Sequence, residues 1–300
     1  MKKYLVFDLG GTLIKHALMN EEGEILARGS VKTPDRSVSR EDLFAVLDEI
    51  AGPYEYDGIA VSSPGILDSG SGIINTVAVF PCLNGCHFKE EAQERYHVPV
   101  SIENDGKCAA LAEVFKGNLQ DVQDGAVMVL GTAVGGAVIL DGKLRRGKHQ
   151  SAGEFSGMCI NFEKPYEKES YEAMLGVKGL IRRVKETAGT EYGSGTEVFD
   201  RIEAGDLAVY EGLVRYCQDL AMAVFSLNLA LDLERVLIGG GISRRPVLIK
   251  EVKKAMERLD EIHPDLRQGV RLPKPEVDVC RYWNDSNLVG ALYHHLCGQN

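Results

Sequence analysis

Two stretches rich in glycine and threonine are the first residues of this sequence that could do chemistry. Gly10-Gly11-Thr12 stands between two apolar runs, and Gly131-Thr132, followed by Gly135, stands between two later ones. Glycines at a bend leave backbone N–H groups open to a ligand, and successive amides form a positive concavity that suits phosphate. We therefore predict a phosphate-binding bend at each stretch. The alternative is a pair of ordinary hairpin turns.

Two aspartates lie at positions where a carboxylate could assist phosphate chemistry. Asp8 stands just before the first bend, where it would repel phosphate unless a cation lay between. Mg²⁺ takes one or two carboxylates plus phosphate oxygens, often through water, so we predict that Asp8 holds Mg²⁺ through water. Asp105 follows Asn104, a favoured N-cap, at the start of a helical pattern. An ionised acid there can accept a hydroxyl proton, which contributes about 10²–10⁴-fold to a rate.

Structural roles are the alternatives for both acids. Asp8 could cap the turn amides, and Asp105 could simply complement the helix dipole. The usual nucleotide motifs do not fit. The sequence has no G-x-x-x-x-G-K-[S/T], and neither Gly10-Gly11 nor Gly239-Gly240-Gly241 makes a G-x-G-x-x-G. The first glycines also lead into a strand pattern and not into a helix, which argues against a dinucleotide-binding fold.

Alternating and continuous apolar runs predict the elements that position these residues. Strands are expected at 3–9, 13–20, 24–32, 57–62, 98–103, 126–131, 134–141, 235–238 and 276–280. Helices are expected at 40–51 and 104–115, over much of 171–231 with the longest at 206–231, from Pro246 and at 286–297. Residues 64–86 read as a long loop with one hairpin, and residues 145–170 as an irregular polar segment. The pattern strand, Gly-Thr bend, strand, turn, strand occurs twice, about 120 residues apart, which indicates a duplicated fold.

Bulk composition excludes several classes. The chain has 300 residues and a net charge of −10, without a long basic run, so no nucleic-acid partner is expected. No apolar stretch approaches the ~20 residues of a membrane span, and a strand pattern begins at once, without room for a signal peptide. A cytoplasmic protein is expected. Seven irregularly spaced cysteines indicate reduced thiols. Cys82, Cys86 and His87 lack a second pair of ligands, so no metal is predicted there.

The motifs together resemble the ROK family of bacterial sugar kinases and repressors, over nearly the whole chain. Asp8-Leu9-Gly10-Gly11-Thr12 and Leu130-Gly131-Thr132-Ala133-Val134-Gly135 are similar to its two phosphate motifs. Glu103-Asn104-Asp105 is similar to its base motif, and Gly239-Gly240-Gly241-Ile242-Ser243 to its adenosine loop. The resemblance implies a duplicated actin-like (ribonuclease H-like) α/β ATPase fold with two lobes and a central cleft.

The resemblance also implies ATP- and Mg²⁺-dependent transfer to the 6-hydroxyl of a hexose, with Asp105 as the base. The implied sugar-binding residues are Gly65, Asn84, Asn104, Asp105, Glu154 and Glu172. Leu13 stands where the family commonly has a lysine. Lys15 shares its strand face and could partly replace it. Two lobes are expected, residues 1–118 with helix 286–297 folded back on them, and residues 119–285.

Two departures from the family pattern bear on the substrate. Gly157 stands where the family usually has a histidine that serves zinc and sugar, and only Cys159 remains of the zinc run. One cysteine cannot close a four-ligand site, so no zinc is predicted. Loss of the histidine would open the pocket near the second carbon of the sugar. We therefore predict glucose or a β-glucoside as acceptor.

Several alternatives remain open. The acceptor could be another hexose, such as N-acetylmannosamine or fructose, since loops 64–88 and 145–172 shape the pocket. The chain could be a sugar-binding sensor without turnover, although both bends, Asp8 and Asp105 argue against this. Other actin-like ATPases are normally longer or lack the Asn104-Asp105 helix start. A repressor would need a DNA-binding domain before the motif at residue 8. A homodimer is expected, because family members often pair.

Overall fold

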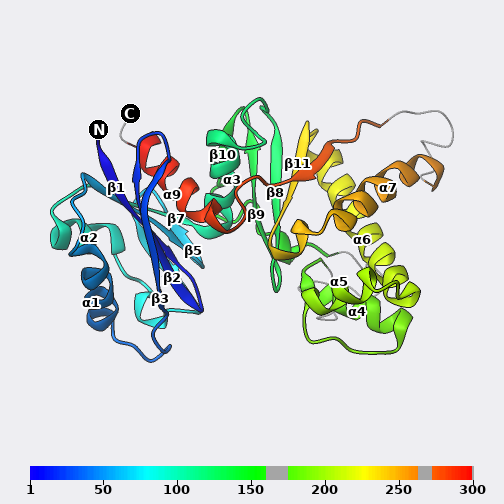
Figure 1. Ribbon diagram of the computed structural model, residues 1–300. Helices are drawn as coiled ribbons and strands as arrows, with labels where there is room; N and C mark the ends of the chain where they lie inside the picture. The colour runs from blue at the N-terminus through cyan, green and yellow to red at the C-terminus, as the bar shows by residue number, and fades with distance from the viewer. Residues whose placement is uncertain (160–174, 263–271, 299–300) are drawn as a thin grey trace. The chain divides into compact units, whose positions relative to one another are not determined.

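The chain folds into two compact units in the computed structural model, which describes residues 1–159, 175–262 and 272–298 (Figure 1). The first unit comprises Met1–Gln120, Arg146–Ala152 and Asn284–Asn300, and the second comprises Asp121–Arg145 and Gly153–Trp283. Nothing in the sequence pattern indicated that Arg146–Ala152 belongs to the first unit. No helix in the described ranges has the length and hydropathy to cross a membrane.

A five-stranded mixed sheet forms the centre of the first unit, in the order β3-β2-β1-β4-β7. Its strands are β1 (Lys3–Leu9), β2 (Leu13–Asn20), β3 (Ile25–Lys32), β4 (Gly58–Ser63) and β7 (Val100–Asn104). A hairpin of β5 (Ile66–Asp68) and β6 (Ile73–Thr76) lies within the loop expected at 64–86. The helices are α1 (Arg40–Ala51), α2 (Phe88–Tyr96), α3 (Asp105–Lys116) and α9 (Ser286–Cys297).

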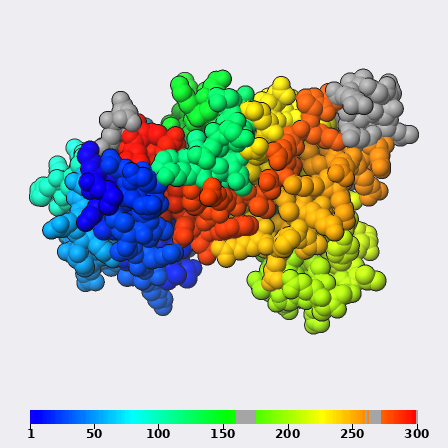
Figure 2. Space-filling view, turned by 45° about the horizontal axis from the view of Figure 1, so that its top comes forward, coloured from blue at the N-terminus to red at the C-terminus, as the bar shows by residue number. Residues whose placement is uncertain are grey.

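The two faces of β1 pack against different helices. Leu5, Phe7 and Leu9 share a buried cluster with Phe44 of α1. Because side chains alternate along a strand, Tyr4 points the other way, and its ring meets His295 of α9 edge-on at 5.2 Å. In this unit α1 and α2 cover one face of the sheet, while α3 and α9 cover the other (Figure 1). The red C-terminal residues accordingly lie beside the blue N-terminal strands (Figure 2).

The second unit contains a five-stranded sheet in the order β10-β9-β8-β11-β12. Its strands are β8 (Gly125–Leu130), β9 (Val134–Leu140), β10 (Lys143–Arg145), β11 (Arg235–Gly239) and β12 (Glu276–Val279). Its helices are α4 (Val177–Ala188), α5 (Gly195–Glu203), α6 (Leu207–Leu231) and α7 (Pro246–Ile262). The long α6 begins at the N-cap Asp206 and buries Leu213, Cys217 and Leu220, at the spacing expected of an amphipathic helix.

The two sheets have the same strand order and the same strand directions. In each, the first three strands are antiparallel, and the fourth and fifth run parallel to the first. Each Gly-Thr bend connects the first strand of its sheet to the second. The duplication inferred from two similar hairpins is therefore confirmed, and it extends to whole sheets. Equivalent residues of the two halves can be compared directly.

Candidate active site

The carboxyl ends of three parallel strands gather polar residues in the first unit. The register aligns Asp8 of β1 with Ser62 of β4, and Ser62 with Glu103 of β7. In open α/β sheets, ligands bind outside the carboxyl ends of the strands. Asp105 begins α3 directly after β7. Both predicted site acids of this unit therefore lie at the same edge of one sheet.

The carboxylate of Asp8 is held by two neutral donors and faces one cation. Asp8 is 5 % exposed, and its Oδ1 accepts hydrogen bonds from Ser62 Oγ at 3.1 Å and Asn287 Nδ2 at 3.0 Å. Lys15 Nζ lies 3.7 Å from Oδ2, because Asp8 and Lys15 are paired across β1 and β2. The lysine and the carboxylate thus form one polar group beside the first bend.

The first bend uses one amide internally and leaves two for a ligand. Gly10 N donates to Asp8 O at 3.0 Å and to Leu13 O at 3.2 Å. A Cβ at Gly10 would lie 2.6 Å from Leu13 O, so this position requires glycine. Among the described residues, none accepts a hydrogen bond from the exposed amides of Gly11 and Thr12. The donors that could hold phosphate here are those two amides and the Thr12 hydroxyl.

The second bend has the same internal contacts. Gly131 N donates to Val129 O at 3.1 Å and to Ala133 O at 3.0 Å. The Gly131 carbonyl accepts the Val177 amide at 2.8 Å, which fixes the bend to the start of α4. Thr132 and Gly135 are exposed. Val129, whose partner across the hairpin is Gly135, occupies the place that Asp8 has in the first sheet. Only the first bend therefore carries a carboxylate.

A cavity of about 330 Å³ opens at the carboxyl ends of β8 and β11 in the second unit. Gly131 and Thr132 of the bend line it, together with Gly241 of the loop after β11. Gly240 shapes this loop, since it has φ +92° and a Cβ there would lie 2.3 Å from Leu130 O. The structure thus brings the second phosphate motif and the predicted adenosine loop to one cavity, although Gly135, Gly239 and Gly240 do not line it.

The sequence patterns predicted helices over 171–231 but did not show that two of them form a wall of this cavity. Val177 of α4, three residues of α5 and Arg245 also line it; the α5 residues are Gly195, Thr196 and Phe199. The start of α5 has the sequence signature of a capping box, Ser194-x-x-Glu197, and the Ser194 side chain accepts the Glu197 amide. The guanidinium of Arg245 lies 5.9 Å from the centre of the Phe199 ring. The Arg245 contacts cross about 40 residues of sequence, so no local pattern could reveal them.

The predicted base lies at the N-terminus of α3. The Asn104 side chain caps the helix by accepting the Lys107 amide at 3.2 Å, and its Nδ2 donates to the Gly65 carbonyl at 2.9 Å. Asp105 Oδ1 accepts the Gly106 amide at 2.8 Å. Gly65 has φ +97°, and a Cβ there would lie 2.3 Å from Thr76 O. Three predicted sugar-site residues, Gly65, Asn104 and Asp105, are therefore joined in this unit.

Of the remaining predicted sugar residues, Asn84 bonds Val77, which is a neighbour of Gly65, whereas Glu154 lies in the second unit. The Oδ1 of Asn84 accepts the Val77 amide at 2.7 Å, so this side chain closes the loop after β6. In the second unit Glu154 is exposed at the start of the short 3₁₀ helix Phe155–Gly157. Gly153 before it packs on β9, where a Cβ would lie 2.6 Å from Ala137 Cα. Glu172 lies outside the described residues.

A buried thiol lies close to the acids of the first unit. Cys108 in α3 is fully buried, and Ser62 shares a hydrogen bond with it as well as with Asp8. Burial, followed by the charges of Glu103, Asp8 and Asp105, holds the pKa of the Cys108 thiol well above its usual value. The thiol stays protonated, so Cys108 is a packing residue and not a nucleophile.

The oxygen donors beside the first bend suit Mg²⁺. No group of three or more His, Cys, Asp or Glu residues in ranges 1–159, 175–262 and 272–298 could enclose an ion. Asp8 offers a single carboxylate, half satisfied by Ser62 and Asn287. Mg²⁺ commonly binds through one or two carboxylates while keeping water and phosphate ligands. Asp8 therefore fits Mg²⁺ that is held mainly by a nucleotide. The cysteines of the described residues form no disulfide among themselves.

Comparisons with known proteins agree on one family. The sequence pattern of the ROK family matches residues 4–294. A beta-glucoside kinase from Listeria monocytogenes is 29% identical, with 99% of each chain covered. An N-acetyl-D-glucosamine kinase from Vibrio cholerae is 27% identical over 85% of this chain and 89% of that protein.

A solved structure extends the agreement to the fold. The crystal structure of a ROK family protein from Streptococcus pneumoniae in complex with sucrose has a TM-score of 0.88 and 32% identity, covering 99% of each chain. The predicted duplicated actin-like α/β fold is thereby confirmed. With the match over residues 4–294 and relatives named as kinases of sugars, the chain belongs to the ROK family and is an enzyme of its sugar-kinase class.

Proposed function

We propose that this enzyme transfers the γ-phosphoryl group of ATP to the 6-hydroxyl of glucose or of a β-glucoside. The acceptor end of this proposal rests on Asp105. Its carboxylate begins α3 at the carboxyl end of β7, and Asn104 fixes that helix start to Gly65 through a 2.9 Å hydrogen bond. A base held in this way needs little reorganisation to orient a hydroxyl.

The donor end rests on the cavity of the second unit. Gly131, Thr132 and Gly241 border a space of about 330 Å³, within the range of about 300–1,000 Å³ typical of small-molecule sites. The exposed bend amides and the Thr132 hydroxyl are donors for phosphate oxygens, and α4 and α5 supply an apolar wall for a base. We assign this cavity to the nucleoside and the two bends to its phosphates.

The chain's own groups have separate roles in the reaction. Asp105 orients the 6-hydroxyl and accepts its proton as the oxygen attacks the γ-phosphorus. The bond from that phosphorus to the β,γ-bridging oxygen breaks, and ADP leaves. Gly11, Thr12 and Lys15 contribute donors and positive charge beside the phosphates. Bound Mg²⁺, held by Asp8 through water, would neutralise phosphate charge. Because phosphoryl transfer has a loose transition state, positioning and charge supply most of the rate.

Gly157 supports a glucoside as acceptor. A Cβ at this position would meet no atom of the described residues within 4 Å, and the residue is exposed. Space is therefore available at the position where the family pattern has a histidine. The beta-glucoside kinase among the relatives fits the same choice. A second candidate acceptor is an N-acetylhexosamine, because a relative of comparable identity is named N-acetyl-D-glucosamine kinase.

A sugar panel tests the proposal. ADP release is measured with ATP and glucose, methyl β-glucoside, cellobiose, N-acetylglucosamine, N-acetylmannosamine and fructose. We expect the highest kcat/KM for a glucose-type acceptor, with a β-glucoside at least equal to free glucose. In Asp105→Asn, kcat should fall by about 10²–10⁴-fold while the acceptor still binds.

Glu49→Gln is the matched control, because Glu49 is an exposed acid on α1 and should leave kcat unchanged. An Asp105→Asn enzyme with full kcat would refute the role of the base. Strong preference for an N-acetylhexosamine or fructose would refute the acceptor while leaving the kinase reaction intact. Binding of sugars without ADP release from any of them would indicate a sensor.

A further inference from the structure

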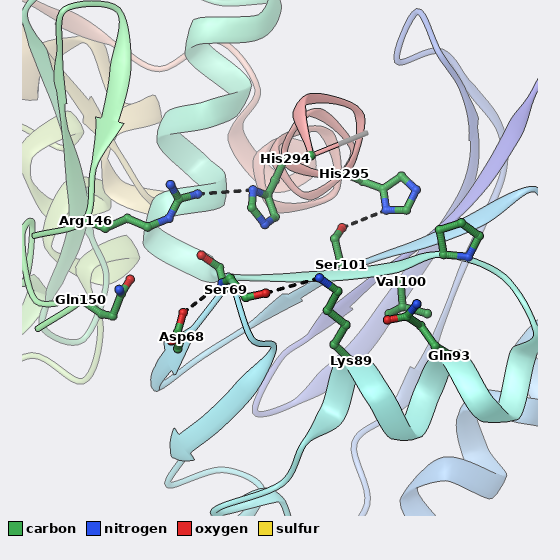
Figure 3. Close-up of a pocket in the computed structure, with 13 residues that line it drawn as sticks. Asp68, Ser69, Lys89, Gln93, Val100, Ser101, Arg146, Gln150, His294 and His295 are labelled. Atoms are coloured by element: carbon green, nitrogen blue, oxygen red, sulfur yellow. Dashed lines mark hydrogen bonds between the residues drawn. The ribbon is translucent and has the colours of Figure 1, made fainter. Parts of the chain in front are cut away.

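A second cavity, of about 520 Å³, lies at the edge of the first sheet (Figure 3). It is lined at the amino end of β7 by Pro99–Ser101, whereas Asn104 and Asp105 stand at the carboxyl end of the same strand. Helix α2, the turn after β5, segment Arg146–Ala152 and the end of α9 complete its wall. The proposed reaction leaves this cavity without a role.

Groups that are or can become cationic converge on it from three elements. Arg146 Nη2 lies 3.4 Å from His294 Nδ1. Lys89 of α2 reaches the Gly70 carbonyl at 3.4 Å, and within the described ranges no carboxylate lies within 4.0 Å of its ammonium group. His295 Nδ1 lies 3.0 Å from Ser101 Oγ. Such a gathering in a chain of net charge −10 favours an anion.

The two imidazoles are kept neutral in the empty cavity. Burial lowers the pKa of His294, and Arg146 and Lys89 lower it further, while Glu103 and the Ile102 carbonyl act the other way. Burial, His294 and Lys89 lower the pKa of His295 to about 4. The ring of Tyr4 and the Ser101 hydroxyl also lie against His295. An anion bound between these groups would offset the positive charges of Arg146 and Lys89. The pKa of the imidazoles would then rise, so that one of them could take up a proton.

The remaining lining narrows the class of ligand. It contains Asp68, Gln93, Ser101 and Gln150, which can bind hydroxyls as donors or acceptors. Among the described residues of the lining there is no Trp, Tyr or Phe ring on which a neutral sugar could stack. We infer that this cavity is a second ligand site, distinct from the proposed acceptor site, that binds a small phosphorylated polyol with Lys89 and Arg146 on the phosphate.

This site is linked to the proposed base through one buried side chain. Arg146 also holds Glu103 Oε2 at 2.7 Å, and Glu103 Oε1 accepts the amide of Asn104 at 2.8 Å. A ligand that draws Arg146 toward its phosphate therefore weakens the Arg146–Glu103 contact, two residues away from Asp105. Occupation of the cavity should change kcat.

Calorimetric titration tests the site in an Asp105→Asn background, where turnover does not interfere. The probes are glycerol 3-phosphate, sulfate and glycerol, with a saturating hexose present to fill the acceptor site. We expect the first two to bind and glycerol not to bind. Lys89→Ala should weaken both by about ten- to hundredfold, as loss of a charged hydrogen bond does. The matched control Lys250→Ala, at an exposed lysine of α7, should have no effect.

Sulfate also gives a clean pH readout, because it stays a dianion where phosphate titrates, near pH 6. Its affinity should rise as the pH falls from 8 to 6, with proton uptake on binding. Equal affinity in Lys89→Ala and the parent, or no binding of either anion at millimolar concentration, would overturn the inference whether or not the chain phosphorylates glucosides. In the active enzyme, glycerol 3-phosphate should change kcat unless Lys89 is replaced; an unchanged kcat would disprove the link to Asp105.

Discussion

The guanidinium of Arg146 holds Oε2 of the Glu103 carboxylate with two nitrogens, Nε at 3.0 Å and Nη2 at 2.7 Å. Glu103 is 1 % exposed. The pair fixes segment Arg146–Ala152 to β7, and the buried Lys107 fixes the same segment by donating to the Gln150 carbonyl at 2.6 Å. Because Glu103 also holds the Asn104 amide, the positions of the segment and of Asp105 depend on one carboxylate.

Replacing Glu103 should therefore affect both stability and turnover. In Glu103→Gln the guanidinium, whose side chain is 32 % exposed, loses its charged partner and a charged hydrogen bond, so the free energy of unfolding should fall by about 1.5–3 kcal/mol. Because Glu103 also holds the Asn104 amide, its loss should shift the start of α3 and with it Asp105. We therefore expect a larger relative fall in kcat than change in KM. Glu276→Gln, which removes the exposed partner of Arg235, is the matched control and should lose no more than about 1 kcal/mol. Equal losses in the two variants, measured by urea unfolding, would contradict this assignment.

Helices α3 and α9 approach each other at a glycine. A Cβ at Gly290 of α9 would lie 1.7 Å from the Cys108 carbonyl of α3. Gly290→Ala must push the helices apart, and overpacking of this kind typically loses about 1–3 kcal/mol of unfolding free energy. Gly298→Ala, at the end of α9 with φ −78°, should be neutral. A Gly290→Ala protein as stable as the parent would show that the helices can separate without loss.

The sequence predicted the central strands better than the helix α2 that packs on them. The strands depend on neighbouring residues, whereas the helix depends on residues far away in the sequence. Strands β1, β2, β8 and β9 are apolar runs broken by glycine bends, so a few neighbouring residues define them. Helix α2 received no prediction, because it is polar and buries only Phe88 and Ala92. Its place is set by packing, including the stacking of Phe88 on Phe44 at 5.4 Å.

The residues of the candidate site likewise fall into those that the local sequence predicted and those that only distant contacts place. Asp8, the bends and the Asn104-Asp105 helix start are local patterns, and the sequence contained them in full. The partners that hold them are distant. Asn287 reaches Asp8 across 279 positions, and Arg146 reaches Glu103 across 43. Arg245 likewise lines the second-unit cavity while bonding Asp200 and Glu203 of α5, more than 40 positions earlier. Such contacts exist only once the fold is formed.

Restoring the missing histidine should change the acceptor preference. In the part of the chain that the structure describes, a Cβ at Gly157 would have no atom within 4 Å, so a Gly157→His side chain would meet no described residue at its first atom. We expect kcat/KM for methyl β-glucoside and cellobiose to fall about tenfold or more relative to glucose, a loss typical of a steric clash worth about 1.4 kcal/mol or more. Gly157→Ala controls for backbone effects and should keep the parent preference. If the ratio of kcat/KM for β-glucosides to that for glucose is unchanged in Gly157→His, Gly157 does not belong to the acceptor site.

The buried histidine of α9 predicts how stability responds to acid. His295 is 2 % exposed, and its pKa is about 4 in the folded chain against a reference value of 6.5. Below pH 6.5 the unfolded chain gains a proton here that the folded chain does not bind until about pH 4. The contribution is therefore constant above about pH 7 and is lost as the pH falls toward 4, amounting to about 2 kcal/mol by pH 5. Burial also lowers the pKa of His294 and of His16, so both add to this dependence of the free energy of unfolding on pH.

Urea unfolding at pH 7 and at pH 5 tests this prediction. The free energy of unfolding should fall less between the two pH values in His295→Gln than in the parent. His87→Gln, at an exposed histidine, should match the parent. Identical losses in all three proteins would mean that His295 binds a proton equally well in both states.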